Sequence, residues 1–140
     1  MGVVRRNGLR AVLALLMSAP LGCSSTTTFE DEGTVCLELD AQGNVRVTVG
    51  FPACLSSSCD QALDTSCTVT RKGTTLQVVS RGAYESEAGS CTLDCQSLTA
   101  SCDATPNIGL TEPGDYTVKH GARTASVSLT PLMPVCVFEP

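Results

Sequence analysis

Hydrophobic and polar residues alternate with a period of two through most of the chain after Thr34. Val35, Leu37 and Leu39 are separated by polar or cysteine positions, and the same pattern resumes after a turn at 41–44. A period of two places alternate side chains on opposite faces of a β-strand, whereas an amphipathic helix has a period of about 3.6 residues. The alternation therefore predicts strands with one buried and one solvated face.

Turn signals separate these alternating segments at regular intervals. Strands are expected at 34–40, 45–49, 67–70, 74–80, 116–119, 122–130 and 135–138, with a further one within 91–102. Between 60 and 66 the sequence allows one helical turn at most. Six to eight short strands at this spacing predict an all-β fold, a small antiparallel β-sandwich over residues 34–140.

The chain has nine cysteines in 140 residues, and none precedes Cys23. An odd number is unusual in an exported protein, where a full set of disulfides needs an even number. With Cys23 set aside, eight remain for about four disulfides. These eight are Cys36, Cys54, Cys59, Cys67, Cys91, Cys95, Cys102 and Cys136.

Four disulfides suit the thin core that this composition predicts, because the chain has no Trp, two Tyr and three Phe. Aromatic side chains bury the largest area. A disulfide contributes about 2–4 kcal/mol, which is large against the about 5–15 kcal/mol of a whole domain. We therefore expect the disulfides to supply much of the stability.

The cysteine spacing leaves many pairings open. Short loops suggest two of the pairs. Cys36 and Cys136 lie opposite the Val/Leu faces of their strands, so they could join the first and last expected strands, and the fourth pair is what remains. The expected pairs are Cys36–Cys136, Cys54–Cys59, Cys67–Cys91 and Cys95–Cys102.

A zinc site is the alternative use of these cysteines. The spacings Cys54 to Cys59 and Cys91 to Cys95 loosely suit zinc, but His120 is the only histidine and disulfides predominate in oxidising compartments. We expect no metal and no cofactor.

Residues 1–22 have the layout of a secretory signal peptide. Arg5, Arg6 and Arg10 precede a short apolar run at 11–17, a basic head followed by an apolar segment. That run is too short to cross a bilayer, which needs about 20 apolar residues. Because the leader holds three of the nine basic residues and no acid, the remaining 118 residues carry a net charge of −8. This acidic balance argues against a nucleic-acid partner.

The end of the leader, residues 18–23, resembles a bacterial lipobox, in which a small residue precedes a cysteine that is lipidated. Gly22 and Cys23 match that pattern, whereas Pro20 stands where the family usually has Leu. The resemblance implies lipidation at Cys23 with more than one acyl chain, which holds a protein stably on a membrane. Ordinary cleavage after Ala19 or Gly22, with Cys23 as a free or paired thiol, is the alternative.

Residues 23–33 combine small polar residues with the acidic run Glu30–Glu32, a composition typical of a flexible tether. The acidic run lacks the alternating acids and Gly of a calcium loop, so we interpret it as solvated.

An Asp after the cysteine would resemble an inner-membrane retention signal. Ser24 stands there instead, which favours the outer membrane.

The segment 109–118 resembles one that recurs in transthyretin-like and carboxypeptidase-regulatory-like modules, with a related form in fibronectin type III domains. It has a Leu followed by Pro113, Gly114 and Tyr116 before a strand. Pro and Gly suit the turn, and the Tyr ring is expected to cover the sheet edge. The resemblance implies a β-sandwich and nothing specific about function.

Candidate catalytic residues are few. His120 lies in an expected hairpin turn, where a histidine is usually solvated, and no serine lies in a Gly-x-Ser-x-Gly motif. Glu85 and Glu87 lie in an expected loop. We expect no enzymatic activity.

Taken together, the leader, lipobox-like end, polar tether and spaced cysteines resemble cysteine-rich lipoproteins of myxobacteria and similar bacteria. The resemblance implies a lipid-anchored outer-membrane protein with a structural or binding role, contacting envelope protein or polysaccharide. Ser and Thr make up 30 of the 118 residues after the leader, which suits hydrated contacts. The alternative is a protease inhibitor in which a closed Cys54–Cys59 loop presents Leu55, because preorganised loops bind tightly.

Overall fold

The computed structural model describes residues 22–140, so the predicted leader lies outside the described residues except for Gly22. The described chain is nearly all strand, with one short helical turn. In chain order the elements are β1 (Ser24–Glu30), β2 (Thr34–Leu39), β3 (Val45–Leu55), β4 (Asp60–Lys72), β5 (Thr75–Glu87), β6 (Gln96–Asp103), α1 (Thr105–Ile108), β7 (Gly114–His120), β8 (Arg123–Leu129) and β9 (Val135–Val137).

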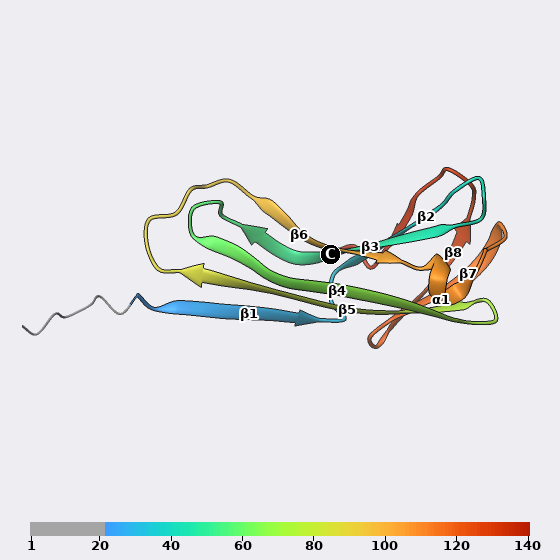
Figure 1. Cartoon of the computed structure of the whole chain (residues 1–140), viewed down its shortest axis with the longest axis horizontal. Coiled ribbons are helices and arrows are strands. Elements are labelled where there is room, and N and C mark those ends of the chain that lie inside the picture. Colours follow the sequence, from blue (N-terminus) through green and yellow to red (C-terminus); the bar gives the residue numbers. More distant parts are fainter. Residues whose placement is uncertain (1–21) are drawn as a thin grey trace, which may run out of the picture.

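The strands form two sheets that face each other (Figure 1). One sheet has the order β1-β5-β7-β8, with β4 paired to β5, and the other has the order β6-β3-β2-β9. Side chains from both sheets meet in one core of mainly Val and Leu, including Val47, Val49, Leu76 and Val118. The predicted all-β sandwich is confirmed, with nine strands among the described residues where six to eight were expected. Its strands are antiparallel as predicted except for β5 and β7, which pair in parallel.

Two local assignments from the sequence are wrong. Residues 60–66 form no helical turn but the first half of β4, and Glu85 and Glu87 lie in β5 and not in a loop. Most side chains in the first half of β4 are exposed. A strand without a buried face shows no hydrophobic alternation, so the sequence pattern could not reveal it.

The flexible tether expected at 23–33 is also not observed. β1 pairs with β5 without interruption over seven residues, from Ser24 opposite Glu87 to Glu30 opposite Arg81. Thr is β-branched and favoured in strands, so a Ser/Thr-rich segment can complete a sheet when an edge is available. Composition alone does not distinguish a flexible tether from a paired edge strand.

Phe29 attaches β1 to the core. Its ring lies 5.9 Å from that of Phe51 and 6.2 Å from that of Tyr84, measured between centroids. Gly82, the residue opposite Phe29 on β5, leaves room for the Phe51 ring: a Cβ on Gly82 would lie 2.8 Å from two ring carbons. The close approach of the two sheets at this point therefore depends on a residue without a side chain.

The four disulfides join Cys36–Cys136, Cys54–Cys95, Cys59–Cys91 and Cys67–Cys102. All eight expected cysteines are therefore paired, and the predicted pair of the first and last is confirmed, joining the neighbouring strands β2 and β9. The other three predicted pairs are wrong: Cys54–Cys59, Cys67–Cys91 and Cys95–Cys102.

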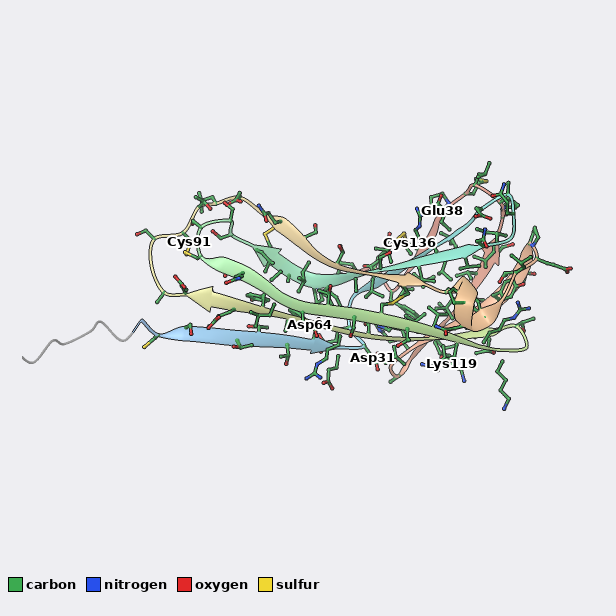
Figure 2. The ribbon with its side chains drawn as sticks, in the orientation of Figure 1. Asp31, Glu38, Asp64, Cys91, Lys119 and Cys136 are labelled. Carbon is green, nitrogen blue, oxygen red and sulfur yellow. A yellow bond between two sulfur atoms is a disulfide. The ribbon has the colours of Figure 1, made fainter. Side chains whose placement is uncertain are left out.

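Spatial neighbours, not short loops, decide these three pairs. A disulfide needs Cα atoms about 4.4–6.8 Å apart, and β3 pairs with β6, so Cys54 lies close to Cys95, the residue before β6. Cys67 on β4 faces Cys102 on β6, which covalently links the two sheets. The Cys59–Cys91 bond lies at the end of the sandwich where β1 begins, and Figure 2 shows Cys91 there.

The segment that leads into β7 has the glycine conformation expected from its sequence, whereas the Tyr116 ring, expected at a sheet edge, lies in the core on the inner strand β7. Gly114 has a φ of 153°, a value that L side chains rarely adopt. Tyr116 is buried, and its hydroxyl donates to the carbonyl oxygen of Glu112 at 2.8 Å. Such a bond to the backbone a few residues upstream recurs in β-sandwiches as the tyrosine corner.

Substitution Gly82→Ala is expected to destabilise the protein by about 1–3 kcal/mol, the usual cost of overpacking a core, because the new Cβ would overlap the Phe51 ring. Gly89→Ala is the matched control, since no atom lies within 4 Å of a Cβ at that position. Guanidinium unfolding of both variants checks this. Equal stability of the two would contradict the packing described here.

Candidate functional site

Cys23 is the one free cysteine among the described residues, and it is exposed. It directly precedes β1, beside a hollow of about 250 Å³ lined in part by Glu85, Glu87 and Ala88. The position predicted for lipidation is therefore the position where a thiol is accessible. Its immediate surroundings are set by the end of β5, which pairs with Ser24.

A network of hydroxyl groups and a carboxylate holds the disulfide-bonded loop at the same end of the molecule. The N–H of Thr92 donates to Ser58 Oγ at 2.8 Å, and the Thr92 hydroxyl lies 3.0 Å from Ser56 Oγ. Asp94 accepts from the Thr92 hydroxyl and from the N–H of Ser57. These bonds hold the pKa of Asp94 below its ordinary value, and the hydrogen bond from the Thr92 side chain is the largest cause.

The loop required by the protease-inhibitor alternative is not formed. Cys54 and Cys59 are bonded to Cys95 and Cys91, not to each other. Leu55 ends β3 on its inward face and is only 5% exposed. A buried side chain cannot enter the pocket of a protease, so this structure removes the premise of that alternative.

His120, expected to be solvated, is completely buried. Its Nε2 lies 2.8 Å from Ser80 Oγ, and Arg123 donates to its Nδ1 at 2.9 Å. The sequence contained a signal for this burial, because Tyr116, Val118 and His120 occupy alternate positions of one strand. The expectation of a surface turn overlooked that the strand continues through His120.

Asp31 Oδ1 lies 4.0 Å from His120 Nε2, which brings Asp, His and Ser together as in serine hydrolases. In those enzymes the carboxylate binds Nδ1–H, and Nε2 accepts the serine proton. Here Arg123 occupies Nδ1, and a guanidinium only donates hydrogen bonds. The imidazole proton therefore lies on Nε2, where it donates to Ser80, so His120 is not placed to activate that hydroxyl.

Asp31, Ser80, His120 and Arg123 form the His120 cluster, which also holds the connection between β1 and β2 in place. Asp31 adopts a left-handed φ of 51°, and its carboxylate accepts from the N–H of Ser80 at 2.9 Å. Arg123 also donates to the carbonyl oxygen of Gly33 at 2.9 Å and lies 4.7 Å from the Phe138 ring centroid. The cluster thus connects the end of β1 with β5, β7 and β8.

A cleft of about 460 Å³ opens beside Arg123, with Phe51, Pro52, Phe138 and the acidic Glu32 among its lining residues.

Over residues 22–140, no three His, Cys, Asp or Glu side chains are grouped so that they could hold a metal ion. Within that same range no helix is long and apolar enough to cross a membrane.

The His120 cluster predicts a pH dependence of stability. Burial, followed by the charge of Arg123, lowers the pKa of His120 from its ordinary 6.5, while Asp31 opposes this shift. The unfolded chain therefore binds a proton at a higher pH than the folded protein does. The stability from this site is fully present above about pH 6.5 and is lost as the pH falls through the folded pKa, at no more than about 1.4 kcal/mol per pH unit.

Guanidinium unfolding on both sides of about pH 6.5 measures this effect against His120→Gln. A glutamine offers both an acceptor for Arg123 and a donor for Ser80, and it does not titrate. We expect the wild type to lose more free energy of unfolding than the variant as the medium is acidified. Parallel losses in the two proteins would show that His120 makes no such contribution.

Comparisons of the chain with protein-family models, with curated proteins and with solved structures return no match.

Proposed function

We propose that this chain is a lipid-anchored protein of the bacterial outer membrane, held through Cys23, with a structural or binding role and no catalysis. The observation that carries the proposal is the separation of the cysteines: eight are paired, and the ninth is exposed immediately before the first strand. That ninth cysteine is also the one that ends the lipobox-like segment 18–23. Two independent features therefore single out the same sulfur.

The disulfides support export from the cytoplasm. Disulfides form and persist in oxidising compartments such as the bacterial periplasm and are rare in the cytosol. Cys67–Cys102 joins the two sheets and Cys36–Cys136 joins β2 to the last strand. A domain with so few aromatic residues needs these bonds to be stable, which in turn needs an oxidising environment.

A structural or binding role is supported by the exposed faces of the sandwich. Thr124, Ser126 and Ser128 follow one another on the exposed side of β8, and Lys119 extends from the neighbouring β7. Such hydroxyl-rich strands offer donors and acceptors for a protein or polysaccharide of the envelope. We propose neither a small-molecule substrate nor a nucleic-acid partner.

Fractionation of cells that produce a Cys23→Ala variant tests the anchor. We expect the variant to move from the membrane fraction to the soluble periplasmic fraction, because it loses the only site for acyl chains. Ser24→Ala is the matched control and is expected to stay with the membranes. Intact-mass measurement of the membrane-extracted wild type is expected to show the added acyl groups.

Sedimentation of the Cys23→Ala protein with membranes would overturn the proposal. Reaction of one thiol per unreduced wild-type molecule with iodoacetamide would do the same. A free Cys23 thiol is alkylated, whereas a thioether to lipid is not.

A further inference from the structure

Cys23 is separated from the folded sheet by no spacer. The residue after it, Ser24, is already paired with Glu87, and the pairing continues to Glu30 without a bulge. Phe29 holds this strand against the core through its contact with Phe51. Acyl chains on Cys23 would therefore be attached directly to one end of the sandwich.

The loop at 88–95 lies at this same end. The N–H of Glu87, opposite Ser24, donates to the carbonyl oxygen of Cys59 at 2.8 Å, and Cys59 is bonded to Cys91. Figure 2 shows Cys91 at the end of the molecule where β1 starts. The start of β1 and this disulfide-bonded loop thus form one end surface.

Leu93 lies within this loop and is completely exposed, with a relative accessibility of 102%. Its neighbours are fixed: Cys91 and Cys95 are disulfide-bonded, and Thr92 and Asp94 bond to the serines at 56–58. The leucine is therefore held in solvent by a constrained loop. Burial of such a side chain in an apolar environment is favourable.

We propose that the Cys23 end of the sandwich lies directly on the phospholipid surface, with Leu93 entering the interfacial region of the bilayer. This inference rests on the proposed lipidation of Cys23. It makes the loop at 88–95 a second membrane contact and gives the domain a fixed orientation. The opposite end, which includes the β2–β3 turn (Figure 1), then points away from the membrane.

The charge of this end surface specifies which lipid it fits. Asp60, Glu85, Glu87 and Asp94 all lie near Cys23 or the loop, and no Lys or Arg lies among residues 82–118. Anionic headgroups repel carboxylates. The contact is therefore held by acyl chains and Leu93, and its partner is a zwitterionic lipid surface.

The absence of tryptophan from the chain allows a direct test with single-tryptophan proteins. Leu93→Trp places the reporter in the loop. Leu110→Trp is the matched control: Leu110 is also exposed, but it packs against the β2–β3 turn at Gly43, at the opposite end. The 13 residues of β5 span about 43 Å, so the two reporters differ greatly in height above the bilayer.

Both variants, processed and lipidated in cells, are reconstituted on phosphatidylcholine vesicles whose acyl chains carry bromine near the ester group. We expect the Leu93→Trp protein to lose roughly half of its fluorescence, because interfacial side chains lie about 5–10 Å deep. The Leu110→Trp protein is expected to be unaffected. Added phosphatidylglycerol is expected to weaken the quenching, and stronger quenching there would contradict a contact held by acyl chains.

Flotation of the vesicles distinguishes the proposed orientation of the domain from the proposed lipid anchor. A vesicle-bound Leu93→Trp protein that is no more quenched than the Leu110→Trp protein overturns the orientation and leaves the anchor intact. Failure to float overturns both. Hydrogen exchange of the unaltered protein gives a second measurement: amides at 88–95 are expected to be slower on vesicles than in the soluble Cys23→Ala form, and unchanged rates would contradict the contact.

Discussion

The antiparallel pairing of β1 with β5 determines where Cys23 lies relative to the rest of the molecule. The seven paired residues leave no free length between the cysteine and the sheet. Phe29 fixes the strand on the core side, and the bonds between Asp31 and Ser80 fix its end. A group attached to Cys23 would thus be carried by the sandwich itself, so the choice between strand and tether decides whether an anchor also orients the domain.

The disulfides and the hydrophobic core stabilise different parts of the sandwich. Val and Leu side chains of β2, β3, β5 and β7 fill the core between the two sheets. Two disulfides, Cys54–Cys95 and Cys59–Cys91, lie at the end where the first half of β4 is exposed. Covalent bonds and the hydroxyl network around Thr92 hold that end where buried apolar area is small.

The buried cluster around His120 shows why residue types alone do not establish chemistry. Ser80, His120 and Asp31 are the side chains of a hydrolase triad, and all three are close together. The donor Arg123 at Nδ1 reverses the direction of the hydrogen bond to the serine. What the cluster does is connect four strands through satisfied polar groups, as buried polar side chains require.

The sequence by itself determined the β-sandwich and the number of disulfides, because the period of two and the even count of the remaining cysteines do not depend on which strands become neighbours. Strand faces suggested the pairing of Cys36 with Cys136, which the structure confirms. Only the tertiary structure decided the other three disulfides, the incorporation of residues 24–30 into a sheet and the burial of His120. Each depends on which strands become neighbours across long stretches of chain. Alternation specifies which face of a strand is buried, but it carries no information about the partner that covers that face or extends that edge.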